Sequence, residues 1–219
     1  VSAHVKYHVS CEDLLKDIGQ RYFDIADELE LTYPIREEFA AFAERASTGG
    51  YSTEELVSRG EYFTARLMAE YLGLPFLDAS KVIAFHHDGT LSMRRTAELV
   101  DEYSQQAGFV MPGFYGATRE GQIKLLDRGG GDISGSILAK CLGADLYENW
   151  TDVSGFFSVD PRIVPEAQPI ARVTYEELRE LSYMGASVLH EEAVFPVREA
   201  GIPLVIKNTN APQDPGTII

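Results

Sequence analysis

The chain has few basic residues for its length. Nineteen Lys and Arg stand against 34 Asp and Glu, which gives a formal net charge of −15 over 219 residues. Proteins that bind nucleic acid carry an excess of Lys and Arg to meet the phosphate backbone, so this balance excludes a nucleic-acid partner. It remains compatible with a small anionic ligand held by a few focused basic groups.

Cysteine is also scarce, since only Cys11 and Cys141 occur. They lie far apart and match no metal-ligand spacing, which indicates two reduced thiols in a cytosolic protein. No apolar run approaches the roughly 18 residues that a membrane span needs. The first ten residues, VSAHVKYHVS, do not resemble a signal peptide. We therefore expect a cytoplasmic protein that does not engage a membrane.

The first seventy residues read as helical. Ser10 and Asp13 are spaced to cap a helix that ends before Pro34, and its apolar positions predict a buried face made of Leu14, Ile18, Phe23, Ile25 and Leu29. A second helix is predicted from about 37 to 46. Ser52 and Glu55 form the spacing of a capping box for a third helix, which should stop at Gly73.

From residue 74 onward, predicted strands alternate with predicted helices. The strands are expected at 74–79, 109–114, 122–127, 145–151 and 203–208, and the helices near 93–106, 132–143, 174–185 and 191–200. This alternation predicts an α/β fold, a three-layer α/β/α sandwich with a mainly parallel sheet. No internal repeat or low-complexity linker is visible. We expect one domain over 1–219, with a mostly helical part at 1–72 and the sheet at 73–219.

The stretch DRGGGD, residues 127–132, carries three consecutive glycines between a predicted strand and a predicted helix. Open α/β sheets bind ligands at this position, outside the carboxyl ends of their strands. Glycines let the backbone approach a ligand closely, and the helix dipole favours an anion there. Arg128 can grip a carboxylate with two parallel hydrogen bonds. Asp132 is equally suited to a plain helix cap.

A second polar loop lies in WTDVSGFFSVDPR, residues 150–162. It follows the strand predicted at 145–151 and keeps several polar and charged side chains within twelve positions. No Walker-type phosphate loop occurs anywhere in the chain. A second polar loop beside the first is therefore what a nucleotide site would need.

Five blocks, in this order, resemble the catalytic domain of the aspartate kinases in the amino-acid kinase family. They are SRGEY (58–62), PGFYGATREG (112–121), DRGGGD (127–132), WTDVSGFFSVDPR (150–162) and YMGASVLHEE (183–192). The trailing IPLVIKNTNAPQDPGTII is similar to the segment that closes that domain. The resemblance is good over about 55–219 and loose over the first fifty residues.

The resemblance implies transfer of a phosphoryl group from Mg-ATP to the β-carboxylate of L-aspartate, the first step toward lysine, threonine and methionine. It implies ATP and Mg²⁺ as cofactors, with no metal site built by the protein itself, and it leaves a homodimer open. The implied catalytic residues are Asp132 and Arg128, and the implied aspartate-binding residues are Glu61, Gly60 and Arg128. The implied ATP-binding residues are Gly129, Gly130, Thr151, Asp152, Phe157, Asp160, Arg162 and Ser187.

The sequence departs from the family pattern in several places. The family's opening Lys-Phe-Gly-Gly-Ser strand has no counterpart, and its C-terminal regulatory ACT domains do not follow. We expect little turnover from a chain without that lysine, because a missing cation at the phosphoryl centre removes transition-state stabilisation. Within the motifs, Ser187 stands where many members carry a lysine, Asp127 replaces glycine or serine, and Gly131 replaces serine.

Two alternatives remain. A sister kinase acting on another carboxylate or on carbamate would share the fold. Glu61 argues against carbamate, which has no ammonium group to pair with, but it does not exclude glutamate. A non-catalytic fragment that binds a nucleotide or an amino acid without turnover is the alternative from a different class.

Overall fold

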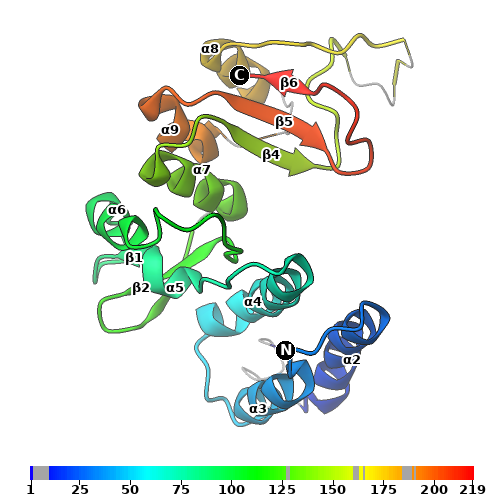
Figure 1. Ribbon diagram of the computed structural model, residues 1–219, viewed down its shortest axis with the longest axis vertical. Coiled ribbons are helices and arrows are strands. Elements are labelled where there is room, and N and C mark those ends of the chain that lie inside the picture. Colours follow the sequence, from blue (N-terminus) through cyan, green and yellow to red (C-terminus); the bar gives the residue numbers. More distant parts are fainter. Residues whose placement is uncertain (2–9, 127–128, 160–162, 165, 184–188, 190) are drawn as a thin grey trace. The chain divides into compact units, whose positions relative to one another are not determined.

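The computed structural model describes residues 1, 10–126, 129–159, 163–164, 166–183, 189 and 191–219. The chain forms two compact units (Figure 1). Unit 1 comprises Val1–Arg95 and Gln105–Leu125, and unit 2 comprises Thr96–Ser104 and Leu126–Ile219. Among the described residues, no helix is both long and apolar enough to cross a membrane.

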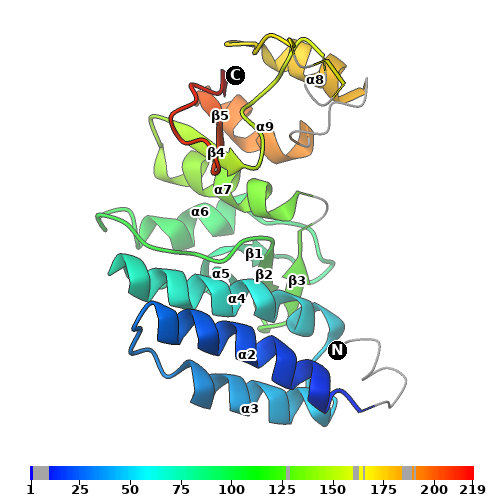
Figure 2. The same ribbon diagram turned by 90° about the vertical axis from the view of Figure 1, so that its right-hand side faces the viewer.

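Unit 1 contains three long helices that lie side by side (Figure 2): α2 (Glu12–Glu28), α3 (Ile35–Ser47) and α4 (Thr53–Leu72). Aromatic rings fill the space between them. The ring centroids of Phe39, Phe42 and Phe63 lie 5.3–5.4 Å from one another. Such tilted and edge-to-face pairs add stabilisation beyond the area that they bury.

Helix α4 begins and ends where its sequence predicts. The Ser52 side chain accepts a hydrogen bond from the Glu55 N–H, and the Glu55 carboxylate accepts one from the Ser52 N–H, so the capping box is confirmed. Gly73 ends the helix in the left-handed conformation that a side chain disfavours.

The predictions for the first helix were wrong in two respects. Helix α2 begins at Glu12 after Cys11, and neither Ser10 nor Asp13 caps it in the predicted way. Its buried side chains are those of Leu15 and Ala26, packed beside Gly19. Most of the predicted face is turned outward, since the side chains of Leu14, Ile18, Ile25 and Leu29 are 37–44% exposed. Phe23 alone of the five is half-buried, and its ring packs edge-on against Phe39. The broad apolar band of this helix offered two faces, and packing against α3 and α4 buried the one that carries Leu15 and Ala26.

The small sheet of unit 1 follows the helices. A short helix, α5 (Ala79–Val82), leads into β1 (Ala84–Phe85), which pairs in parallel with β2 (Tyr115–Thr118), and β2 pairs antiparallel with β3 (Ile123–Leu125). The third strand confirms the prediction at 122–127 over its described part. Helix α6 (Met93–Asp101) is shorter than the predicted 93–106.

Two predicted strands of this region do not form. Only a single bridge, between Phe76 and Val110, joins the segments 74–79 and 109–114. Asp78 instead caps α5, accepting a hydrogen bond from the Ser80 N–H at 2.9 Å. Pro75 and Pro112 lie inside these segments and have no N–H group to donate, which limits the ladder to this bridge.

Unit 2 consists of α7 (Gly130–Leu142), β4 (Tyr147–Thr151), α8 (Tyr175–Tyr183), α9 (Glu191–Ala200), β5 (Leu204–Asn208) and β6 (Thr217–Ile218). Strand β5 lies between β4, its parallel neighbour, and β6, its antiparallel one. The strands predicted at 145–151 and 203–208 are confirmed, as is the helix ending at Gly143. The Thr174–Glu177 capping box before α8 is also present.

The core of unit 2 is mainly aliphatic. Leu178, Val197, Leu204 and Ile206 are fully buried in one cluster formed by the helices and the sheet. Helices α7 and α9 pack closely, and the Ser136 hydroxyl accepts a hydrogen bond from the Val197 N–H at 3.2 Å. The core therefore ties the first turns of α7 to the sheet that β4 and β5 form.

Candidate functional site

The N-terminus of α7 is built from glycine. Gly129 precedes the helix with φ of 73°, a left-handed conformation that glycine adopts without strain. The first helical hydrogen bond runs from the Ile133 N–H to the Gly129 carbonyl at 2.9 Å. The N–H groups at the start of a helix have no partner within it. A Cβ added at Gly131 would meet nothing within 4 Å, so the fold itself does not require glycine there.

Asp132 lies in this first turn and is connected to β4. The Asn149 amide donates one hydrogen bond to Asp132 Oδ1 at 2.8 Å and another to the Tyr147 hydroxyl at 3.2 Å. The Tyr147 hydroxyl donates to the Asp132 backbone carbonyl at 3.1 Å. The Asp132 carboxylate and the Tyr147 hydroxyl oxygen both act as acceptors here, so the Asn149 amide must turn its NH₂ group toward them rather than its carbonyl oxygen. The closed triangle joins the N-terminus of α7 to the middle of β4.

Alternation along β4 explains this arrangement. Successive side chains of a strand point to opposite faces, so Tyr147, Asn149 and Thr151 share one face, while Glu148 and Trp150 are exposed on the other. A Cβ at Gly135 would lie 2.6 Å from the Tyr147 hydroxyl oxygen, so glycine makes room for the ring. Burial raises the pKa of the Tyr147 hydroxyl, and the nearby Asp132 charge adds to the rise.

The polar loop begins where β4 ends. Thr151 is half-buried, and its carbonyl accepts hydrogen bonds from the Thr209 N–H at 2.8 Å and the Thr209 hydroxyl at 2.9 Å. Asp152 is exposed, and its carboxylate accepts a hydrogen bond from the Thr151 hydroxyl at 3.3 Å. Phe157 is half-buried and its backbone forms a bridge with Pro169. The loop thus presents an open carboxylate beside a fixed backbone.

The turn that follows β5 fixes the middle of this loop. Ser154 donates to Asp214 Oδ2 at 2.6 Å and accepts from the Asn208 amide at 2.9 Å. The Phe156 N–H donates to the Thr217 hydroxyl at 2.9 Å. Gly155 lies between them with φ of 96°. We call these contacts the loop clamp, defined by Ser154, Phe156, Asn208, Asp214 and Thr217.

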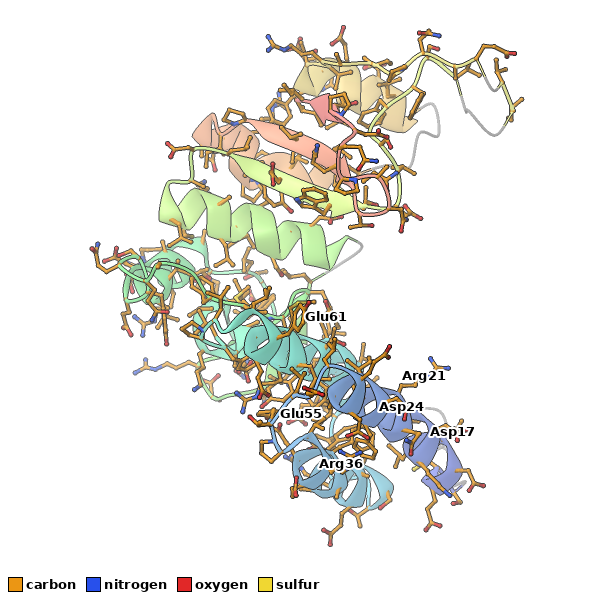
Figure 3. The ribbon with its side chains drawn as sticks, turned by 45° about the vertical axis from the view of Figure 1, so that its right-hand side comes forward. Asp17, Arg21, Asp24, Arg36, Glu55 and Glu61 are labelled. Atoms are coloured by element: carbon orange, nitrogen blue, oxygen red, sulfur yellow. The ribbon has the colours of Figure 1, made fainter. Side chains whose placement is uncertain are left out.

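In unit 1, Gly60 and Glu61 lie in the middle of α4. Glu61 is exposed at the helix surface (Figure 3). The Tyr22 hydroxyl of α2 donates to the Gly60 carbonyl at 3.0 Å. Burial raises the pKa of the Tyr22 hydroxyl, and the Glu61 charge contributes to the rise. A Cβ at Gly60 would have only the Tyr22 hydroxyl in ordinary contact, at 3.8 Å, so packing does not demand glycine here.

The structure therefore brings together part of the predicted site. In unit 2, Gly129, Gly130 and Asp132 are linked to the strand that carries Thr151 and Asp152 into the polar loop with Phe157. In unit 1, Gly60 and Glu61 are neighbours on one helix. The remaining predicted residues, Arg128, Asp160, Arg162 and Ser187, and the departure at Asp127, lie outside the described residues.

Sequence reasoning missed Asn149, Tyr147 and the loop clamp. A signal for the first two was present, because the inward positions of YENWT are all polar or hydroxyl-bearing. Buried polar side chains need hydrogen-bond partners, so these positions indicated polar contacts to a neighbouring element or a ligand. The clamp had no comparable signal, since its members come from segments about sixty residues apart.

A family model described as the amino acid kinase family matches residues 14–208. Aspartokinase 3 of Bacillus subtilis is 36% identical over 222 residues, covering 95% of this chain and 49% of that protein. The chain spans about half the length of several curated aspartokinases that match it nearly throughout, and a smaller share of the longer bifunctional ones.

Two solved structures are also similar. An aspartate kinase of Clostridium acetobutylicum has a TM-score of 0.94 and 46% identity, covering 99% of this chain and 50% of that one. Escherichia coli aspartokinase III in complex with aspartate and ADP has a TM-score of 0.81 and 30% identity, covering 93% and 50%.

Proposed function

The chain belongs to the amino acid kinase family, and we propose that it is a catalytic portion of an aspartate kinase. The proposed reaction transfers the terminal phosphoryl group of Mg-ATP to the β-carboxylate of L-aspartate and yields 4-phospho-L-aspartate. Support comes from the aspartokinases of three bacteria that match over nearly the whole chain. One of them is a complex with aspartate and ADP.

A single feature of the geometry carries the proposal. The glycine-built N-terminus of α7 is tied to the middle of β4 through the Asn149–Asp132 hydrogen bond of 2.8 Å. Helix N-termini bind phosphate because their free N–H groups and the helix dipole favour negative charge. The arrangement therefore supports a nucleotide whose phosphates lie over Gly129–Gly131 and whose other parts contact the polar loop.

The proposed roles follow from chemistry. Phosphoryl transfer to a carboxylate needs positioning and charge neutralisation more than a nucleophilic side chain, since the acceptor is already ionised at neutral pH. Asp132 would organise the reacting groups, and Thr151, Asp152 and Phe157 would contact the nucleotide. Glu61 would pair with the ammonium of aspartate, because it is an exposed carboxylate beside a glycine that the packing of α4 does not need.

Magnesium fits this set as a partner of the nucleotide. Among the described residues, no three His, Cys, Asp or Glu side chains gather into a metal site. Mg²⁺ is commonly held by substrate phosphates and only one or two carboxylates. Of the predicted nucleotide-site residues that the structure describes, Asp132 and Asp152 are the carboxylates that could contribute, and the ion would neutralise phosphate charge.

Ligand binding tests the proposal directly. A ligand that binds only the folded chain raises its melting temperature, so Mg-ATP and L-aspartate should each produce a shift that grows with concentration. L-Glutamate and carbamoyl phosphate serve as comparison ligands for the sister kinases. Absence of a shift with Mg-ATP and with L-aspartate would contradict the proposed function.

Product formation distinguishes an active kinase from a non-catalytic fragment that only binds the ligands. Acyl phosphate can be trapped with hydroxylamine while ADP release is followed in parallel. Binding of both ligands with no acyl phosphate would favour a non-catalytic binding fragment, whereas trapped 4-phospho-L-aspartate would establish turnover.

A further inference from the structure

Asp132 does not behave as an acidic residue at its helix position usually does. It is the third residue of α7, the position from which a side chain can turn back and accept a hydrogen bond from the N–H group of the N-cap residue, here Gly129. The preceding Gly129 has no side chain with which to cap the helix. Within the described parts of the chain, the only donor to the Asp132 carboxylate is the Asn149 amide.

Asn149 is held more rigidly than the carboxylate that it binds. Its backbone pairs with Ile206 in the parallel β4–β5 ladder, and the residue is only 7% exposed. Its second N–H is engaged by the Tyr147 hydroxyl. Asp132, by contrast, is half-buried in the first turn of a helix. The strand therefore determines where the carboxylate points.

Resting on the proposed function, we propose that Asn149 is a positioning residue that stops Asp132 from capping its own helix. The N–H groups of residues 130–132 then remain available to the phosphates of the nucleotide. Without Asn149, the carboxylate would turn back toward the Gly129 N–H and place a negative charge beside the N–H groups where an anion should bind.

This role makes an unusual prediction about sign. Loss of a polar residue that only supports the fold lowers the free energy of unfolding, and its effect on affinity does not depend on Asp132. If Asn149 acts through Asp132, its loss frees a carboxylate to cap α7, so affinity for the anion falls although the helix gains a cap. The loss of affinity should also vanish once the Asp132 carboxylate is removed.

The test is a double-mutant cycle on Mg-ATP affinity, measured by calorimetry with the complete 219-residue chain. Asn149→Leu preserves volume and removes both donors. We expect it to raise the Kd of Mg-ATP about tenfold in the wild-type background, the scale of losing a partner that orients a ligand-binding group. In the Asp132→Ala background the same change should alter the Kd by less than about twofold, since the competing carboxylate is gone.

Two further variants serve as a replacement for Asn149→Leu and as a control. Should Asn149→Leu fail to fold, Asn149→Asp keeps the shape of the side chain but replaces the donating NH₂ group with an acceptor. It should raise the Kd of Mg-ATP in the wild-type background and leave it nearly unchanged in the Asp132→Ala background. Tyr175→Phe is the control, because its hydroxyl donates only to the Ile202 carbonyl within the core.

The outcomes are distinct. An equal rise of the Kd in both backgrounds, or no rise in either, overturns the positioning role and leaves the proposed function standing. Failure of the wild-type chain to bind Mg-ATP overturns the nucleotide site and this inference with it. A tenfold loss that disappears with Asp132→Ala supports both.

Discussion

The two units hold their candidate residues in different ways. In unit 1, Glu61 projects from the middle of a twenty-residue helix that is fixed by an aromatic core, and its position needs no polar network. In unit 2, Asp132 and the polar loop depend on hydrogen bonds from Asn149 and the loop clamp. A residue on a long packed helix inherits rigidity from the core, whereas a residue at a helix start or in a loop needs its own partners.

Truncation of a core side chain should have the largest effect on the free energy of unfolding, and it should destabilise mainly the unit in which the side chain lies. Phe63→Ala, at a position 2% exposed among Phe39, Phe42 and Tyr22, should cost about 3–5 kcal/mol. Leu178→Ala in unit 2 should cost about 2–5 kcal/mol. Hydrogen exchange should show each loss mainly in the unit that carries it. Met68→Ala, at a position 45% exposed, is the control for Phe63. Equal loss of protection throughout the chain would contradict the division.

Gly155→Ala tests the dependence of unit 2 on its clamp. The backbone there has φ of 96°, and an added Cβ would lie 2.8 Å from the Thr217 nitrogen, so we expect a loss of about 1–3 kcal/mol. Mg-ATP affinity should fall as well, because the loop shifts. Gly201→Ala is the comparison, because Gly201 has φ of 67° and an added Cβ would meet no atom within 4 Å. This change should lower stability by roughly 1 kcal/mol without changing the affinity for Mg-ATP. If the two changes altered the affinity for Mg-ATP equally, the loop clamp would not contribute to nucleotide binding.

The two capping boxes offer a matched pair, one in each unit. Ser52→Ala and Thr174→Ala each remove a hydroxyl that accepts from a glutamate N–H at 3.2 Å. Each should lower the free energy of unfolding by about 1 kcal/mol. Denaturant titration with circular dichroism measures both. Neither should change ligand affinity, and a change in either would show that its helix start is coupled to a site.

Two glycines should give the smallest effects on stability. Gly60→Ala should stabilise α4 by about 0.5–1 kcal/mol, because alanine costs less in a helix and its Cβ has room. Gly131→Ser should change stability by less than about 0.5 kcal/mol. We expect Gly60→Ala to weaken L-aspartate binding in spite of its stabilising effect. Unchanged affinity in a more stable variant would argue against close approach of a ligand to this helix.

Much of the fold was predictable from local signals. Both capping boxes, the left-handed glycines after α4 and α7, and the strands β4 and β5 lie where the sequence predicts. The family resemblance and the α/β fold class are confirmed by the comparisons and the structure. These features depend on a few neighbouring residues or on ordered motifs, and both are readable along the chain.

The errors share one physical origin. The outward stripe of Leu14, Ile18, Ile25 and Leu29 has a helical period as good as that of the face that is buried. Only the packing of α2 on its neighbours decided between the two faces. The segments near 76 and 110 have apolar sequences, but they pair only at the Phe76–Val110 bridge, because Pro75 and Pro112 interrupt the ladder. Periodicity identifies an element without identifying its contacts.

The sequence alone determined the helix boundaries set by caps, the glycine-rich helix start and the motifs that reveal the family, because each is encoded within a short segment. Only the tertiary structure decided which face of α2 is buried, that Asn149 holds Asp132, and that the turn after β5 clamps the polar loop. Those contacts join residues 17 to 61 positions apart, and close packing and hydrogen bonding select them only once the core has formed.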